Sequence, residues 1–308
     1  MVDGSLVLAP DMLATNIAIN TGYSGNEPTP PTQKKLWGLG FSPYNDDGSC
    51  ADLGKVTSQL EAVAKIASNI RLYATDCSQL ANAMQAISNS GLSLGVHAGI
   101  WASSGPDRVN AELDQFVAAA KKYDRALIKG LSVGNEALRN GVSVDQLIGH
   151  IQNVRARLKA EGLGGIPVYT TEVDTAFTPA LVDACDLLQI NLQVVFGSAF
   201  TSTSASAHEV ISRADAFKSK FARGKSVQIG EAGWPSAGKL GPFPLTLDNQ
   251  KGFARAFKCL VDKTDYNYFY FEAKDALWKS GQSLPEQSFG VFSAGFTPKF
   301  DFGLFNSC

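Results

Sequence analysis

Short apolar runs alternate with longer amphipathic stretches along most of this 308-residue chain. Each short run is followed by a loop, and such runs are typical of strands. Eight of them occur, at residues 36–44, 69–75, 93–101, 128–136, 167–174, 187–195, 226–234 and 267–278.

The stretches between these runs have apolar residues at intervals of three and four, which is the period of a one-faced helix. The clearest examples cover residues 53–67, 109–123, 144–162 and 249–263. Eight strands alternating with helices over roughly 270 residues predict an α/β protein with a single (β/α)8 TIM barrel. A doubly wound sheet is the alternative, but the loop SPYNDDGSC after the first run contains neither GxGxxG nor a Walker pattern.

The beginning of the chain lacks this rhythm. The segment NTGYSGNEPTPPTQKK is rich in Pro, Thr, Ser and Gly, a composition typical of linkers. We therefore expect an N-terminal arm over residues 1–35 and a catalytic barrel over residues 36–308. The first ten residues, MVDGSLVLAP, contain no intact signal peptide.

Two of the predicted strands end in a glutamate. Glu136 follows Asn135 at the end of the fourth run, and Glu231 lies in GEAGWPS at the end of the seventh. Active sites of such barrels lie at the C-terminal ends of the strands, so both carboxylates are expected in one mouth. A retaining glycosidase uses two carboxyl groups about 5 Å apart, one as acid/base and one as nucleophile.

The neighbours of the glutamates fit a sugar site. Asn135 can bind a sugar hydroxyl, Gly230 and Gly233 can leave room for a pyranose, and Trp234 can be a platform for a sugar face. Taken singly, each glutamate would be an ordinary loop residue and Trp234 ordinary rim packing; the pair on two strands of one barrel favours the site. His97 fits a core histidine and a site-lining donor equally well.

Composition narrows the partners. The formal net charge is −2 and no polybasic run occurs, so nucleic acid and anionic membrane surfaces are not expected partners. No segment is long and apolar enough for a membrane span. The three histidines and five cysteines form neither HExxH nor CxxC, so we expect no metal site. A disulfide between Cys50 and Cys77 is our first expectation, while the pairing of Cys185, Cys259 and Cys308 stays open.

Four motifs together resemble glycoside hydrolase family 17, especially its fungal members that act on beta-1,3-glucan. They are GFSPYNDDGSC, IRLYATDC, VGNEAL and GEAGWPS, and the resemblance runs from about Trp37 to near Lys279. It implies a (β/α)8 barrel, retaining chemistry on beta-1,3-glucan, no cofactor, and a secreted or cell-wall setting. We further expect a monomer.

By position, Glu136 matches the acid/base of that family and Glu231 matches its nucleophile. The resemblance also implies substrate-binding roles for Tyr44, Arg71, Tyr73, Asn191, Trp234, Glu272, Asp275, Trp278 and Lys279.

Two segments depart from the family pattern. FEAKDALWK replaces the frequent FEAFDEPWK, with Lys274 in place of Phe and Ala276 in place of an acid, and INLQVVF replaces N-x-x-P-[FY]-F. Both lie near the expected sugar cleft, so the shape of the subsites and the product pattern stay open.

Hydrolysis and glucanosyl transfer share a glycosyl-enzyme on Glu231 and differ only in the acceptor. Hydrolysis or mixed activity is the favoured prediction, and dominant transfer is the alternative. Five aromatic residues could form acceptor subsites or simply pack: Trp101, Phe196, Phe200, Phe243 and Trp278. A barrel that binds beta-glucan without catalysis is less favoured, because both glutamates are present.

Overall fold

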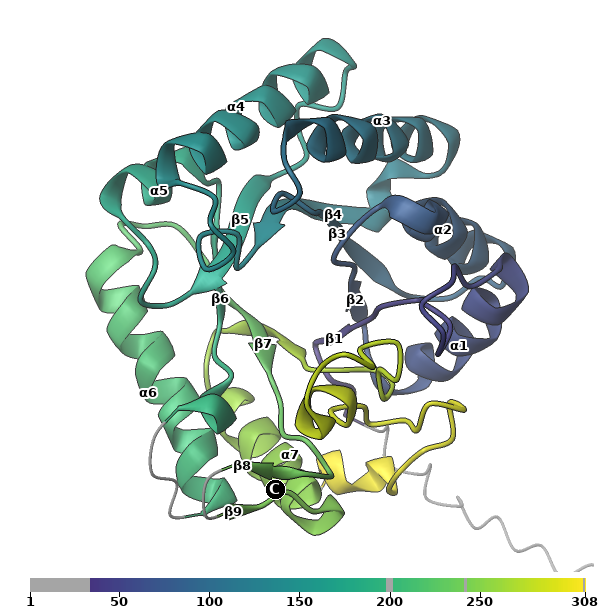
Figure 1. The fold of residues 1–308 in the computed structure, drawn as a ribbon, viewed down its shortest axis with the longest axis vertical. Helices are drawn as coiled ribbons and strands as arrows, with labels where there is room; N and C mark the ends of the chain where they lie inside the picture. The colour runs from purple at the N-terminus through teal and green to yellow at the C-terminus, as the bar shows by residue number, and fades with distance from the viewer. Residues whose placement is uncertain (1–33, 198–201, 241–242, 307) are drawn as a thin grey trace, which may run out of the picture. The chain divides into compact units, whose positions relative to one another are not determined.

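The computed structural model describes residues 34–197, 202–240, 243–306 and 308. Within them, parallel strands close a barrel in the order β1-β10-β7-β6-β5-β4-β3-β2. Figure 1 shows the ring that they form, viewed through its centre. The TIM barrel prediction is confirmed. The strands of the ring are β1 (Gly38–Gly40), β2 (Asn69–Arg71), β3 (Gly95–Ile100), β4 (Ile128–Asn135), β5 (Val168–Val173), β6 (Leu188–Asn191), β7 (Val227–Ala232) and β10 (Asn267–Tyr270).

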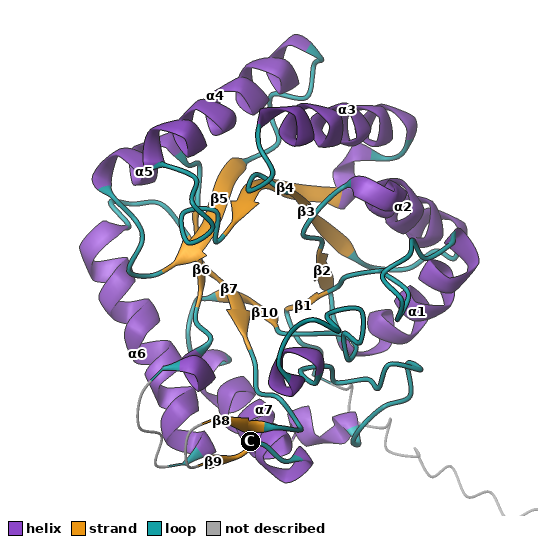
Figure 2. Cartoon of the chain, viewed as in Figure 1, coloured by secondary structure: helices purple, strands orange, loops and turns teal. Residues whose placement is uncertain are grey.

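Helices surround this ring (Figure 2). All four helices predicted from periodicity are present, with ends that differ from the prediction by at most three residues. Local signals fix some of their starts: Ser143 and Gln146 form a reciprocal capping box at the start of α4. The helices are α1 (Leu53–Ile66), α2 (Gln79–Asn89), α3 (Pro106–Lys122), α4 (Val144–Ala160), α5 (Pro179–Ala184), α6 (Thr203–Phe221) and α7 (Leu247–Val261).

The last apolar run is a strand only at its beginning. The predicted strand covers residues 267–278, whereas β10 ends at Tyr270. Beyond it single bonds to the barrel remain, from the Phe271 amide to the Ala232 carbonyl at 2.9 Å and from the Ala273 amide to the Gly40 carbonyl at 2.8 Å. Lys274 then pairs with Phe292 in an isolated bridge. Between β7 and α7 the chain also forms a short antiparallel hairpin that was not predicted, from β8 (Lys239–Leu240) and β9 (Phe243–Pro244).

Polar side chains fill part of the barrel interior and satisfy one another. Ser132 Oγ and Thr171 Oγ1 are 2.8 Å apart, Thr171 Oγ1 donates to Gln189 Oε1 at 2.7 Å, and Gln189 Nε2 donates to Gln228 Oε1 at 3.1 Å. These residues are all buried. Below the carboxylates, the barrel is therefore a packed core rather than a channel.

His97 belongs to this core. Its side chain is buried, Nδ1 lies 3.2 Å from the Tyr169 hydroxyl, and its ring packs edge-on against Trp37 and Phe269. Burial lowers the pKa of His97 to about 3, and the charge of Arg71 adds to this effect. Of the two readings of His97, the core histidine is the one that the structure supports.

The predicted disulfide between Cys50 and Cys77 is present and joins the loops after β1 and β2. A second disulfide joins Cys259 of α7 to Cys308, and Cys185 is a buried free thiol. The predicted arm at residues 1–35 lies almost wholly outside the described residues.

Candidate active site

The two glutamates reach the same end of the barrel from different strands. Glu231 lies within β7, and Glu136 follows the last residue of β4. Asn191 ends β6, next to both, and is paired with Glu231 across a register shift between β6 and β7. All three therefore stand at the C-terminal ends of parallel strands, where barrel enzymes carry their active sites.

A continuous set of hydrogen bonds connects the two carboxyl groups. Arg71 Nη1 donates to Glu231 Oε1 at 3.2 Å and to Asn191 Oδ1 at 3.3 Å, and Asn191 Nδ2 donates to Glu136 Oε1 at 3.0 Å. Arg71 and Asn191 also donate to Asn135 Oδ1, at 2.6 and 3.0 Å. The structure thus brings together five residues that the sequence analysis predicted for the site.

An irregular backbone directs Glu136 into this cluster. The pairing of β4 with β5 shifts register between Ser132 and Asn135, and Gly134 within the shift has a φ of +89°. Such a bulge re-aims the residues that follow it. Glu136 itself has a φ of +49°, which is uncommon for a residue other than glycine.

Burial has the largest effect on the pKa of Glu231. Its residue is 6% exposed, and burial raises the pKa of Glu231 to about 7. The Arg71 guanidinium opposes the rise and the Glu136 carboxyl adds to it. Tyr73 lies beside Arg71, with its ring centroid 4.5 Å from the Arg71 guanidinium carbon; burial and then the charge of Glu231 raise the Tyr73 pKa. Glu231 is therefore ready to change ionisation close to neutral pH.

Two residues of this region were missed by the sequence reasoning. Gln193 Nε2 donates to Glu231 Oε2 at 3.1 Å, and it belongs to the segment INLQVVF that departs from the family pattern. Glu172, in β5, is fully buried beside the loop of Glu136. A glutamate near the end of the fifth apolar run was the signal available for Glu172.

A second group of predicted residues forms an aromatic and charged wall. The rings of Tyr44 and Trp278 are 5.0 Å apart, and Lys279 Nζ lies 5.5 Å from the Trp278 ring. Lys279 Nζ also donates to Glu272 Oε1 at 3.3 Å, and its charge lowers the Glu231 pKa. Tyr44 is held by its hydroxyl, which donates to Asp76 Oδ1 at 2.8 Å.

Trp234 is not a sugar platform, contrary to the prediction. It is 1% exposed and its ring stacks on Phe253 of α7, with centroids 5.5 Å apart. Successive side chains point to opposite faces of an extended chain. Glu231 faces inward, so Trp234, three residues later, faces the helix layer.

The two glycines beside Glu231 do not make room for a sugar either. A Cβ at Gly233 would lie 2.0 Å from the carbonyl oxygen of Phe271, and one at Gly230 would lie 2.8 Å from Asn191 Oδ1. These glycines permit close packing of the protein's own strands and side chains.

Asp275 also has a different role from the one predicted. Its Oδ1 accepts from Lys299 Nζ at 2.8 Å and from the backbone amide of Gly290 at 3.0 Å. It therefore braces the segment after β10 instead of facing the glutamates. The neighbouring Lys274 is 3% exposed and donates to Asp46 Oδ1 at 3.0 Å.

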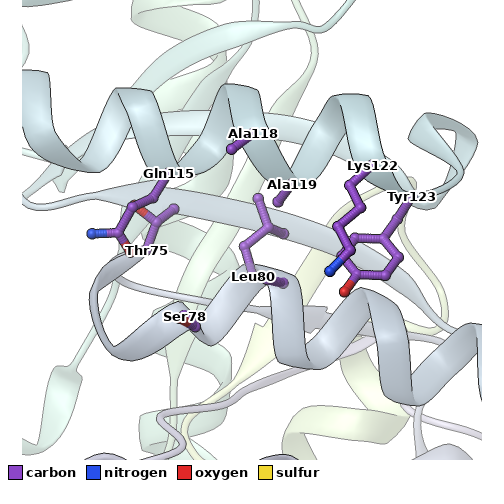
Figure 3. A pocket seen from close by; sticks show the side chains of 9 residues that line it. Thr75, Ser78, Leu80, Gln115, Ala118, Ala119, Lys122 and Tyr123 are labelled. Carbon is purple, nitrogen blue, oxygen red and sulfur yellow. The ribbon is translucent and has the colours of Figure 1, made fainter.

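A hollow elsewhere on the barrel lies between α2 and α3 (Figure 3). It is distinct from the candidate site, because none of its residues belongs to the cluster around the glutamates. The hollow is lined by Thr75, Ser78, Leu80, Ala81, Gln115, Ala118, Ala119, Lys122 and Tyr123.

Metal ligation and membrane spanning find no support in residues 34–197, 202–240, 243–306 and 308. Among them, no three His, Cys, Asp or Glu side chains converge as the ligands of a metal ion would. The helices in the same part of the chain are all too short or too polar to cross a membrane.

The barrel and its glutamates define the class of protein, a glycoside hydrolase. Comparison with known proteins agrees: residues 38–290 match the family described as BtgE/BtgC glycoside hydrolase domain, and the chain belongs to that family. This also confirms the resemblance seen in the sequence, since relatives include family 17 enzymes.

Among curated relatives, the chain is 30% identical over 261 residues to the "Probable beta-glucosidase btgE" of Aspergillus fumigatus, covering 83% of this chain and 45% of that protein. It is 29% identical over 263 residues to the "Probable family 17 glucosidase SCW10" of Saccharomyces cerevisiae, covering 83% and 64%. The chain thus spans about half the length of these relatives.

Among solved structures, the fold is similar to that of the glycoside hydrolase family 17 beta-1,3-glucanosyltransferase from Rhizomucor miehei. The TM-score is 0.75 at 23% sequence identity, and the match covers 86% of this chain and 95% of that one. An active-site mutant of the Rhizomucor miehei beta-1,3-glucanosyltransferase in complex with laminaritriose matches with a TM-score of 0.76, also at 23% identity.

Proposed function

We propose that this domain is a retaining glycosidase that acts on beta-1,3-glucan, with Glu231 as nucleophile and Glu136 as acid/base. The observation that supports it most strongly is the hydrogen-bonded path from Glu231 through Arg71 and Asn191 to Glu136. It holds two carboxyl groups at one mouth, as double displacement requires.

The surroundings of each glutamate fit its proposed role. A nucleophile must be ionised when it attacks, and both oxygens of Glu231 accept hydrogen bonds, from Arg71 and from Gln193. The acid/base must exchange its proton in every cycle, and the Glu136 side chain is 22% exposed. Water or an acceptor can therefore reach Glu136 more readily than Glu231.

The reaction proceeds in two steps. The Glu136 carboxyl gives its proton to the glycosidic oxygen while a Glu231 oxygen bonds to the anomeric carbon, and the carbon–oxygen bond to the leaving sugar breaks. In the second step Glu136 takes a proton from water or from a sugar hydroxyl. That oxygen then bonds to the anomeric carbon and releases Glu231.

Three features support a neutral glucan as substrate. Among the described residues, both hydrogen bonds of the Asn135 side chain use its Oδ1, which leaves its side-chain NH2 group to bind a sugar hydroxyl. The Tyr44 and Trp278 rings can contact a sugar face. The similarity in fold to an enzyme solved with laminaritriose supports beta-1,3 linkage.

Hydrolysis, alone or mixed with transfer, is the activity that we propose, and dominant glucanosyl transfer is the second candidate. Phe196 favours some transfer, because it is 46% exposed just after β6 and could bind an acceptor sugar. Trp101 and Trp278 are partly exposed. Phe200 lies outside the described residues, and the side chain of Phe243 is not described.

The setting that we propose is secreted or in the cell wall, with the domain acting as a monomer. Two disulfides support it, because such bonds persist in oxidising compartments. Net charge near zero suits an uncharged polysaccharide better than a polyanion.

The test is a product time course on linear beta-1,3-gluco-oligosaccharides that resolves chain length, with Glu231→Gln as the inactive control. Products that are only shorter than the substrate would establish hydrolysis. Early products longer than the substrate would establish transfer. The proposal fails if the wild-type protein binds the oligosaccharides without turnover, a result that would favour a binding barrel.

A further inference from the structure

A third glutamate lies close to the candidate site but behind it. Glu172 in β5 has no exposed surface, and its Oε1 accepts from the backbone amide of Leu138 at 3.3 Å. Its Oε2 is buried without a hydrogen-bond partner among the described residues. Such a half-satisfied carboxyl costs free energy that an apolar side chain would not, so its presence here calls for a role.

The direction of the strand places Glu172 outside the barrel interior. Thr171, its neighbour, bonds to Ser132 and Gln189 within the interior. Alternate side chains of a strand point to opposite faces, so Glu172 points toward the helix layer, beneath the loop that follows β4. From there it contacts that loop and has no path to a substrate in the mouth.

That loop contains the strained residue of the site. Glu136 has a φ of +49°, a left-handed conformation that is unfavourable for a residue other than glycine. It persists where the surroundings hold it. The Glu136 amide donates to the Thr171 carbonyl at 2.8 Å, and Asn140 Nδ2 donates to the Glu136 carbonyl at 2.9 Å. Backbone bonds within the turn add to these, from the amides of Asn140 and Val142 to the Ala137 carbonyl at 3.1 Å each. The bond from the Leu138 amide to Glu172 differs from them all, because its acceptor is a buried side chain from another strand.

We propose that Glu172 is a positioning residue: by holding the backbone at Ala137 and Leu138, it keeps the Glu136 carboxyl aimed at the glycosidic oxygen. This inference rests on the proposed role of Glu136 as acid/base. The electrostatics agree with the contact. Burial raises the pKa of Glu172 to about 7, the amides of Leu138 and Ala137 oppose the rise, and the Glu136 charge adds to it.

The test uses substrates that differ in their need for an acid. A laminari-oligosaccharide has a poor leaving group that must be protonated, whereas 2,4-dinitrophenyl β-laminaribioside has one that leaves without a proton. Both need Glu231 equally. Loss of acid positioning therefore lowers kcat/KM for the oligosaccharide selectively, whereas general damage to the barrel lowers both.

Three variants separate the possibilities. Glu172→Met keeps the side-chain length and removes the hydrogen-bond acceptor. Glu172→Ala removes the acceptor with a smaller side chain and is the second variant to use if the Met variant does not fold. Glu172→Gln keeps a carbonyl acceptor. Circular dichroism and thermal unfolding establish folding. For Met or Ala we expect kcat/KM to fall about 10- to 100-fold on the oligosaccharide and less than about 3-fold on the dinitrophenyl substrate. For Gln we expect both values within about 3-fold of wild type, since the acceptor is retained.

Equal losses on the two substrates, or no loss on either, would overturn the positioning role. So would a Gln variant as impaired as the Met variant, because the retained acceptor should rescue it. Hydrogen exchange adds a readout independent of activity: the Leu138 amide should exchange faster in the Met variant, and an unchanged rate counts against the contact. Failure of the proposed function is recognised separately, by a Glu136→Gln variant with wild-type activity on the oligosaccharide.

Discussion

The two catalytic candidates occupy the same mouth but are built differently. Glu231 lies in β7, where the pairing with β6 and β10 shifts register, and its side chain is 7% exposed. Its oxygens accept from the buried Arg71 and the half-buried Gln193. Glu136 follows a bulge, takes a left-handed backbone, and has a side chain that is 22% exposed. The two carboxyl groups therefore differ in burial: the one proposed as nucleophile is enclosed, and the one proposed as acid/base is open to solvent. Substitutions around either carboxyl group can break this contrast.

The largest effect is expected from Glu231→Gln. A Gln side chain keeps the volume but cannot form the glycosyl-enzyme, so kcat should fall about 10⁴-fold or more. The measurement is kcat on laminari-oligosaccharides. Glu209→Gln in α6 is a matched control, because its side chain is 42% exposed, and it should leave kcat unchanged. Substantial activity in Glu231→Gln would remove Glu231 from the reaction.

Arg71→Met should have the next largest effect, a loss of about 10²- to 10³-fold in kcat/KM. Arg71 lowers the pKa of Glu231. Without it that pKa rises, and Glu231, which must be ionised to attack, becomes active only at higher pH. The acidic limb of the kcat/KM profile should therefore move to higher pH. A profile that keeps its acidic limb would show that Arg71 does not tune the nucleophile.

Stability should depend on pH through buried glutamates whose pKa is raised, among them Glu172 and Glu231. The folded protein holds the protons of Glu172 and Glu231 to about pH 7, whereas the unfolded chain releases them near the ordinary value of 4.5. Their stabilising contribution is therefore full below pH 4.5 and declines as pH rises toward 7. Glu172→Gln removes one of the two groups and should flatten the decline by about 2 kcal/mol. Urea unfolding at pH 5 and pH 8 measures the free energy of unfolding of both proteins. An equal change in that free energy between the two pH values for variant and wild type would contradict the burial argument.

The smallest effects on kcat/KM are expected from removing a single hydrogen-bond partner of Glu231 or of Glu136. Gln193→Ala removes a half-buried donor to Glu231 and should lower kcat/KM about 10-fold. Arg139, 3.4 Å from Glu136 Oε2, has a side chain that is 66% exposed, so Arg139→Ala should change kcat/KM less than about 2-fold. Steady-state kinetics of the two variants sharpen the contrast. A larger loss at Arg139 than at Gln193 would reverse it.

Much of the fold could be predicted from local pattern. The eight apolar runs and the helical periods are local properties of the chain, and the barrel followed from their alternation. Boundaries were less predictable where pairing ends. The last run was predicted to continue to residue 278, yet the strand ends at Tyr270 and Lys274 pairs with Phe292, a contact that no local pattern encodes.

Of the residues in the candidate site, some could also be predicted from the sequence and others could not. Glu136 and Glu231 could be found because each ends a strand, and Arg71 and Asn191 because they match motifs. Trp234 was misassigned because motif position does not tell which face a side chain takes. Gln193 and Glu172 were missed because their roles depend on contacts across 38 and 34 residues of sequence.

The central claim is that Glu231 forms a covalent bond to the sugar. The most direct measurement is to incubate the wild-type protein with 2,4-dinitrophenyl 2-deoxy-2-fluoro-β-laminaribioside, which slows release of a glycosyl-enzyme, and to locate the label by peptide mass spectrometry. The account predicts one fluorosugar per chain, attached at Glu231 and absent from Glu231→Gln. A label on another residue would contradict it, and so would turnover of the oligosaccharide with inversion at the anomeric carbon and no label at all.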